Sequence, residues 1–244
     1  MIKIENVETF GWEAAIRGMR NPKNSWKKSD SEWYPMGIPT TNPAAINDKY
    51  LSQKYCLGDN DLGLMTRLRN AGTDHRKFMR MIAVYLDITA PLYWWKEFDT
   101  YKVGTVANSC STMHKIADKE FTLEDFSCEH LTTQSVECLK NTIDLLNMHR
   151  SLYISKTDKK VDRYTVMSDE CYTKYKKDIW WQLIQLLPSS YNQKRTIMLN
   201  YEVLANIYKS RRNHKLDEWH TFCDWIETLP YSELIIGKGE PTGD

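Results

Sequence analysis

Three short groups of polar residues in this 244-residue sequence have side chains suited to contacting a bound ligand. His75 precedes an apolar run, Tyr101 and Lys102 follow a tryptophan-rich segment, and residues 108–114 read Asn-Ser-Cys-Ser-Thr-Met-His. A run of small, hydroxyl-bearing residues lets backbone amides approach a phosphate closely, so this last group is a candidate anion site. A tyrosine ring can stack on a planar ligand. Anion binding and ring stacking are therefore the chemistry that these residue types suggest.

The common catalytic motifs are absent from the sequence. It contains no P-loop and no GxGxxG, GxSxG or HExxH pattern. Cys128, His130, Cys138 and His149 have metal-binding side chains, but their spacing matches no closed four-ligand zinc pattern, so we expect no metal site. The six cysteines include no CxxC pair, which favours free thiols in a reducing compartment.

The elements that must position these residues begin with a loop-rich N-terminal segment. We expect a short helix near residues 12–20, and prolines at positions 22, 35, 39 and 43 deny long regular elements to the rest of residues 1–57. Cap candidates at residues 59–61 and a glycine stop at Gly72 predict a helix between them.

An apolar strand and a tryptophan-rich helix are predicted next. Residues 81–88 are apolar and partly β-branched, which predicts a short central strand that ends before Pro91. Pro91 suits the first turn of a helix that carries Trp94 and Trp95. Adjacent helix positions point about 100° apart, so at least one of these tryptophans is expected in the core or in a subunit contact.

From residue 122 onwards the spacing predicts helices only. Thr122 and Asp125 resemble a capping pair, and a charged stretch at 157–163 is expected to be a solvated excursion. Apolar residues indicate four helices, over 134–152, 168–187, 200–211 and 216–229. Because no repeat or linker is evident, we predict one domain over 1–244 that ends in a tail at 237–244.

The composition argues against several classes of protein. Lys and Arg number 33 against 32 Asp and Glu, so no uniform positive field and no extended nucleic-acid surface are expected. No window approaches the roughly 18 consecutive apolar residues that a membrane helix needs, so we expect a cytoplasmic protein with no membrane partner. Aromatic residues make up 12% of the chain, a supply suited to buried contacts or to stacking on ligands.

The residues from His75 to Thr105 follow a known order. His75 is followed by the apolar strand, then by Lys96-Glu97, then by Thr100-Tyr101-Lys102. This resembles the flavin-dependent thymidylate synthases, in which a Gly-His segment precedes a strand, an Arg-Gln pair, and the signature Arg-His-Arg followed by Ser-x-Asn-Glu-x-Ser-x-Arg-Tyr. With one inserted residue, the signature's Asn, second Ser and terminal Tyr fall on Asn108, Ser111 and His114.

A second block extends the resemblance to residues 57–230. Leu187-Pro188 and the segment Asn200-x-Glu202-x-Leu204-x-Asn206-Ile207-x-x-x-Arg211 are similar to the family's Leu-Pro step and its Asn-x-Arg-x-Leu-x-x-Phe-x-x-x-Arg helix. Residues 216–219 resemble its closing Ala-Gln-x-Glu segment imperfectly.

Four arginines of the family pattern are missing. Thr100, Met113 and Glu202 stand at three of these positions, and the fourth is lost near Ile184. In the family these arginines hold the phosphate and base of dUMP and the diphosphate of FAD, to which a guanidinium offers a fixed fork of donors. Lys102 supplies only a point charge, and Glu202 is expected to repel a diphosphate. We therefore expect weaker binding of the family's ligands, or binding of a different one.

The resemblance implies an α+β fold, a small central sheet with many flanking helices, assembled as a homotetramer. It implies reductive methylation of dUMP to dTMP, with FAD, NADPH and methylene-tetrahydrofolate. The catalytic positions implied are Arg211, which polarises the pyrimidine, and Lys102. Cofactor-binding positions implied are His75, Tyr101, Lys102, Asn200 and Asn206. Substrate-binding positions implied are Glu97, Asn108, Ser111, His114 and Arg211, with Lys102 and Ser111 at the phosphate.

Each of these residues also has a simpler interpretation. A lone histidine before a strand is usually structural, Asn200 is an ordinary helix cap, and Arg211 at a helix C-terminus suits the helix dipole. Two alternatives for the whole protein stay open. One is a non-catalytic relative that binds a nucleotide or a protein, and the other is a helical interaction protein whose resemblance to the family is accidental.

Overall fold

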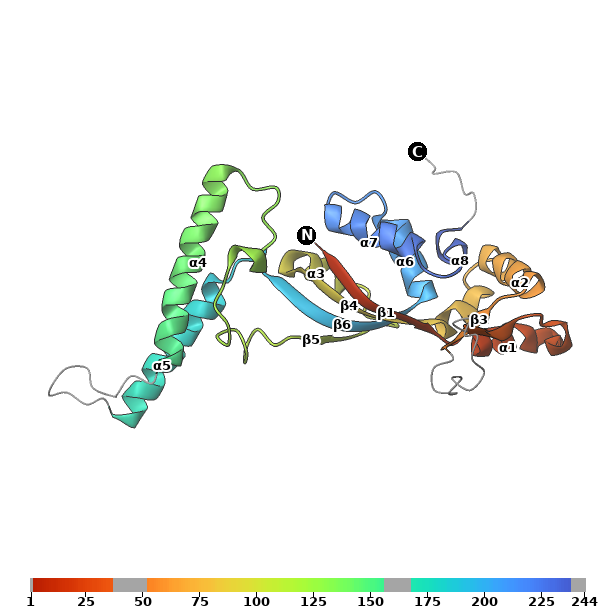
Figure 1. Cartoon of the computed structure of the whole chain (residues 1–244), viewed down its shortest axis with the longest axis horizontal. Coiled ribbons are helices and arrows are strands. Elements are labelled where there is room, and N and C mark those ends of the chain that lie inside the picture. Colours follow the sequence, from red (N-terminus) through yellow and green to blue (C-terminus); the bar gives the residue numbers. More distant parts are fainter. Residues whose placement is uncertain (1, 37–51, 156–167, 238–244) are drawn as a thin grey trace, which may run out of the picture.

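The computed structural model describes residues 2–36, 52–155 and 168–237, and it is elongated (Figure 1). A sheet lies at the centre, a pair of long helices projects at one end, and two helices lie at the other. Of the expected features, the excursion at 157–163 and residues 238–244 of the tail lie outside the described residues.

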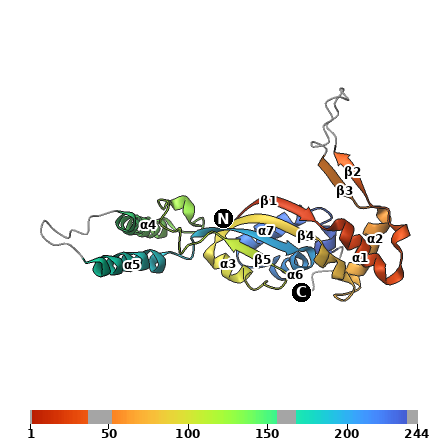
Figure 2. The same ribbon diagram turned by 90° about the horizontal axis from the view of Figure 1, so that it is seen from below.

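The central sheet has four strands, and each neighbouring pair is antiparallel. In sheet order these are β1 (Lys3–Phe10), β4 (Ala83–Pro91), β6 (Asn192–Asn200) and β5 (Val106–Ser109). Strands β4 and β6 pair over their whole length, from Ala83 opposite Asn200 to Pro91 opposite Asn192. A separate antiparallel pair, β2 (Glu32–Met36) and β3 (Ser52–Cys56), projects from the end of the molecule that carries α1 and α2 (Figure 2).

Eight α-helices flank the sheet in the described part of the chain. They are α1 (Trp12–Arg20), α2 (Asp59–Asn70), α3 (Leu92–Phe98), α4 (Thr133–Ile154), α5 (Asp169–Leu186), α6 (Tyr201–Arg211), α7 (Asp217–Glu227) and α8 (Glu233–Ile236). The side chains of Thr132, Ser168 and Asn200 cap α4, α5 and α6 by accepting a hydrogen bond from a backbone amide three residues on. Every predicted helix is therefore confirmed, within a few residues at its ends.

One face of the sheet is packed and the other is open. Val84, Leu86 and Ile88 of β4 are fully buried against the helices, whereas Tyr85 on the opposite face is exposed. The packed side holds an aromatic cluster in which Trp94 contacts Trp95, Phe98, Trp219 and Phe222. We expected at least one of Trp94 and Trp95 in the core or in a subunit contact. Both are buried in the core.

The long helices have a smaller core of their own. Leu139 and Leu146 of α4 pack with Leu183 of α5 and with Phe121 and Phe126. This set is separate from the main core beneath the sheet. The projecting helix pair therefore carries its own packing (Figure 1).

The prediction of strands needs correction. Strand β4 runs over residues 83–91 rather than 81–88, and Pro91 ends the strand and precedes α3 instead of entering its first turn. Strand β6 lies where only helices were expected. Strand β5 includes the first two residues of the run 108–114, which was interpreted as a candidate anion site. Strands β1, β2 and β3 lie in the segment that was expected to be loop-rich. The physical reason is that each of these strands lies at an edge or faces solvent on one side, so none of them presents a continuous apolar run.

A buried ion pair joins the two helices at the far end of the molecule. Arg20 of α1 donates from Nε to Oδ1 of Asp61 in α2 at 2.6 Å, and both side chains are almost fully buried. Burial alone would raise the pKa of Asp61, but hydrogen bonds from Ser29, Ser31 and Arg20 outweigh it and hold the pKa below its usual 3.8. The stabilisation is therefore fully present above about pH 4 and is lost as the pH falls through the folded-state pKa.

We expect Asp61→Ala to lower the free energy of unfolding by about 3–5 kcal/mol, because it leaves the Arg20 guanidinium buried without its carboxylate. Urea unfolding at neutral pH measures the change. Asp59→Ala, at an exposed position in the same first turn of α2, is the control and should cost less than about 1 kcal/mol. Equal losses for the two variants would contradict the role given to this pair.

Candidate functional site

A glutamate near the end of α3 gathers donors from three parts of the chain. Oε2 of Glu97 accepts hydrogen bonds from Nη1 of Arg211 at 2.6 Å and from the indole Nε1 of Trp219 at 3.3 Å. Nε2 of His214 lies 3.2 Å from the same oxygen. The sequence distances between Glu97 and these partners exceed one hundred residues, so the fold alone brings them together.

Arg211 is held on several sides. It is the last residue of α6, where a cation suits the helix dipole, and its Nε donates to the hydroxyl of Tyr101 at 3.0 Å. Its guanidinium carbon lies 4.9 Å from the ring centre of Trp219, a cation–π distance. Its side chain is 17% exposed and that of Glu97 is 35% exposed. The pair is thus fixed in position and open to solvent on one side.

A second polar cluster lies where the 3-10 turn of residues 76–81 meets α6. Glu202 is buried and pairs with both Arg76 and Arg80. Nη2 of Arg76 also donates to the amide oxygen of Asn206 at 3.1 Å. The expectation that Glu202 would repel a diphosphate treated its carboxylate as unpaired, whereas two guanidinium groups pair with it. His75 precedes this turn and its side chain is exposed.

The hydroxyl-rich run lines a hollow of about 390 Å³ at the end of the sheet near α4 and α5. Cys110, Ser111 and Thr112 contribute to its wall, and Phe121 and Tyr191 supply aromatic surface. Three lysines also line it, namely Lys115, Lys119 and Lys194, and each pairs with an aspartate. Oγ of Ser111 accepts a hydrogen bond from the amide of His114 at 3.0 Å.

The predicted site residues fall into separate groups. Glu97, Tyr101 and Arg211 lie in direct contact. Asn206 joins the Glu202 cluster through Arg76, and the side chain of Asn200 is taken up in capping α6.

The remaining predicted residues lie in the segment that follows α3. Lys102 lies in the exposed turn after α3, and Asn108 lies in β5 opposite Thr196. Ser111 lines the lysine-rich hollow, whereas His114 lines a different hollow beside Tyr153 and Trp180.

Sequence reasoning missed four members of these clusters. His214 and Trp219 complete the surroundings of Glu97, and Arg76 and Arg80 complete those of Glu202. The sequence signal for Trp219 was the closing block at residues 216–219, which lies a few residues after Arg211. For the two arginines the signal was their closeness to His75, since Arg76 directly follows it and Arg80 lies five residues after it.

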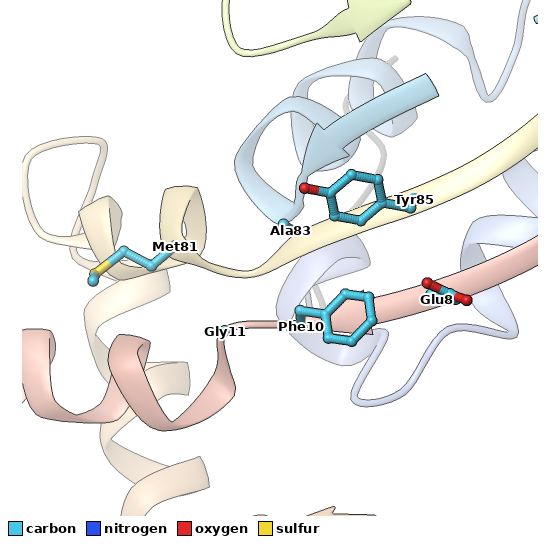
Figure 3. A pocket seen from close by; sticks show the side chains of 6 residues that line it. All are labelled: Glu8, Phe10, Gly11, Met81, Ala83 and Tyr85. Atoms are coloured by element: carbon cyan, nitrogen blue, oxygen red, sulfur yellow. The ribbon is translucent and has the colours of Figure 1, made fainter. Parts of the chain in front are cut away.

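A hollow of about 360 Å³ on the open face of the sheet contains none of the predicted residues (Figure 3). Phe10 of β1 and Tyr85 of β4 stand over it with ring centres 5.9 Å apart. Gly11 forms its edge with φ at +92°, and a β-carbon there would lie 2.0 Å from the carbonyl oxygen of Met81. Glycine is required by both the backbone conformation and the close approach.

Two further features concern metals and membranes. Within residues 2–36, 52–155 and 168–237, no three His, Cys, Asp or Glu side chains are placed to hold a metal ion. None of the helices described is long and apolar enough to cross a membrane.

Comparison with known proteins gives a result at the level of structure. No family model matches the sequence, and no curated protein matches it. Among solved structures, the flavin-dependent thymidylate synthase ThyX from Helicobacter pylori, complexed with FAD and dUMP, superposes with a TM-score of 0.58. It is 14% identical, and the match covers 95% of this chain and 96% of that one.

A second neighbour is a UMP/dUMP methylase, PolB from Streptomyces cacaoi, bound with 5-Br UMP. Its TM-score is 0.52 at 13% identity, over 93% of this chain and 88% of that one. The chain therefore has the fold of the flavin-dependent thymidylate synthases. The predicted α+β fold and the resemblance in the sequence are confirmed at this level, and the alternative of an accidental resemblance is wrong.

We expect Tyr101→Phe to lower the free energy of unfolding by about 1 kcal/mol, because it removes the hydroxyl that accepts from Nε of Arg211 while the ring stays. Tyr85→Phe is the control, since its hydroxyl bonds to no described residue and its side chain is exposed. It should change stability by less than about 0.5 kcal/mol. Chemical denaturation of both variants measures the free energy of unfolding. If Tyr101→Phe leaves it unchanged, this hydroxyl does not hold the arginine.

Proposed function

We propose that this protein is a flavin-dependent methylase that acts on a pyrimidine nucleotide, with dUMP as the first ligand to test. The observation that carries the proposal is the fixed position of Arg211 between Glu97, Tyr101 and Trp219. The resemblance assigns to this arginine the contact with the pyrimidine base. Further support comes from two fold neighbours, a thymidylate synthase complexed with FAD and dUMP and a methylase bound with 5-Br UMP.

Arg211 has the properties needed to act on the base. Nη2 of Arg211 makes no hydrogen bond to any described residue, so it keeps donors for a ring oxygen. A positive charge beside that oxygen stabilises negative charge that develops on the ring during the reaction. Because its neighbours fix the guanidinium beforehand, little reorganisation is needed when the ligand binds. The arginine would bind, orient and polarise the base.

The Glu202 cluster fits the flavin cofactor that the resemblance implies. Nε of Arg76 is buried without a hydrogen bond in the described part of the chain, 3.4 Å from Oε1 of Glu202. Beside this atom lies the guanidinium of Arg80, whose side chain is 56% exposed, and such an accessible guanidinium suits an oxygen of a diphosphate. Arg76, Arg80, His75 and Asn206 would hold FAD here, with Tyr101 and Lys102 nearer the substrate. When bound, FAD supplies the hydride, and methylene-tetrahydrofolate and NADPH supply the carbon and the reducing equivalents.

The nucleotide phosphate is assigned to Ser111 and Lys102. Oγ of Ser111 already accepts a hydrogen bond from the amide of His114, so its own hydrogen stays available for a phosphate oxygen. Lys115, Lys119 and Lys194 line the hollow beside it, each paired with an aspartate, and Asn108 and His114 flank the same segment. The chain therefore needs no protein nucleophile, because its residues position and polarise the ligands.

A homotetramer is part of the proposal, and α4 supports it. The helix buries Leu139 and Leu146 against α5, yet its opposite side carries Leu145, Met148 and Leu152 at the spacing i, i+3, i+7, all exposed. A helix that is apolar on two opposite sides usually has both sides covered. We assign the outer side to another copy of this chain.

A non-catalytic relative that binds a nucleotide is the second candidate function. The observation that favours it is the loss of the signature arginines at Thr100 and Met113, whose side chains supply no positive charge. The two candidates share the nucleotide site and differ in turnover. Formation of dTMP by the purified protein, with FAD, NADPH and methylene-tetrahydrofolate, separates them.

Titration of the purified protein with FAD and then dUMP tests the ligand sites. We expect a flavin absorption band at a fixed ratio to the chain, and a nucleotide affinity that falls about 10- to 100-fold in Arg211→Ala, the range for a lost charged hydrogen bond. Arg212→Ala is the matched control. Arg212 lies beside Arg211 but pairs with Asp224 and Glu227, so its loss should leave affinity unchanged. A protein that shows no flavin absorption band and binds neither FAD nor dUMP would overturn the proposal.

Sedimentation analysis of two single-lysine variants tests the assembly. Met148→Lys places a charge on the exposed apolar side of α4 and should reduce the tetramer to smaller species. Ser151→Lys adds the same charge on the polar side of the same helix and should leave the assembly intact. A wild-type monomer would refute the assignment of this surface.

A further inference from the structure

We propose that the base bound beside Arg211 is cytosine rather than uracil, so that the nucleotide is a cytidylate such as dCMP. The proposal rests on the proposed function, because it takes the pyrimidine site as given and names the ring. Its basis is the carboxylate of Glu97. The resembling family carries an Arg-Gln pair where this chain has Lys96-Glu97, so an acid stands where an amide is expected.

The two oxygens of Glu97 have different surroundings. Oε2 accepts hydrogen bonds from Nη1 of Arg211 and Nε1 of Trp219, and Nε2 of His214 lies 3.2 Å from it. Oε1 accepts no hydrogen bond from any described residue. The side chain is 35% exposed, and this second oxygen is not one of the buried polar atoms that lack a partner, so solvent reaches it.

The site therefore presents a pair of complementary groups to a ligand edge. Glu97 forms an ion pair with Arg211, and a carboxylate only accepts hydrogen bonds. Arg211 only donates them, through the free Nη2. A ligand that fits both must bring a donor to Glu97 and an acceptor to Arg211.

Cytosine meets this requirement without conflict. Its edge reads amine donor at position 4, ring nitrogen acceptor at position 3, and carbonyl acceptor at position 2. The amine donates to Oε1 of Glu97, and the two adjacent acceptors both lie on the side of Arg211. A carboxylate that accepts from the 4-amine is the pairing that proteins use to recognise cytosine.

Uracil fits the same pair with a conflict. Its edge reads acceptor, donor, acceptor, because carbonyl oxygens flank the single N–H at position 3. If that N–H donates to Glu97 and one carbonyl faces Arg211, the other carbonyl lies against the carboxylate, acceptor to acceptor. A glutamine amide can rotate to donate to that oxygen, but a carboxylate has no hydrogen to offer.

The size of the effect follows from the cost of one mismatched polar contact, roughly 10- to 100-fold in affinity, which corresponds to about 1.4–2.8 kcal/mol. Direct titration of the full chain, loaded with FAD, with dCMP and separately with dUMP measures this preference. We expect the wild-type protein to bind dCMP at least about 10-fold more tightly than dUMP.

Glu97→Gln tests the cause of the preference, because it keeps the size of the side chain and restores a donor. It should reverse the order, so that dUMP binds more tightly than dCMP. Glu137→Gln makes the same chemical change at an exposed position on α4 and should leave the wild-type preference intact.

The outcomes separate this inference from the function on which it rests. If the wild-type protein binds dUMP as tightly as dCMP or more tightly, cytosine recognition is overturned and the pyrimidine site stands. If it prefers dCMP and Glu97→Gln keeps that preference, Glu97 is not the determinant and the inference is overturned. If neither nucleotide binds, the proposed function fails together with the inference.

Discussion

One carboxylate oxygen holds the candidate site together. Oε2 of Glu97 binds the last residue of α6 and the buried tryptophan of α7, and it is itself carried by α3, which packs beneath the sheet. Trp219 can reach that oxygen because the aromatic cluster fixes its ring against Trp94 and Phe98. The hydrophobic core and the polar site therefore depend on each other, since the position of Arg211 follows from the packing of aromatic rings.

The sequence allowed the helices to be predicted better than the sheet, for a physical reason. Helices are marked by local signals, such as the capping oxygens of Ser168 and Asn200 and the proline after α5. Strand β6 reads Asn-Gln-Lys-Arg-Thr-Ile-Met-Leu-Asn, and its first half is polar because Lys194 faces the open side while Arg195 stacks on Trp95. Strand β1 is an edge strand with a register shift between Glu5 and Glu8. Neither presents the apolar run from which a strand is predicted.

The candidate site could be predicted only where it follows a linear pattern. Glu97 and Tyr101 lie four residues apart, and their place in the family order marks both of them in the sequence. The partners of Glu202 could not be found in this way, because its pairing with Arg80 joins segments 122 residues apart and leaves no periodic trace. The sequence therefore showed the charge of Glu202 without the two arginines that pair with it in space.

The separate small core of α4 and α5 has a consequence for the motions of the molecule. Packing that does not continue into the core beneath the sheet allows the two helices to open and close as a cooperative unit of their own. We therefore expect amide hydrogens in α4 and α5 to exchange with solvent through openings that cost less free energy than global unfolding, and those of β4 to exchange only when the whole domain unfolds. The division of the packing into two cores thus predicts a slowly exchanging centre and a helix pair that exchanges more rapidly.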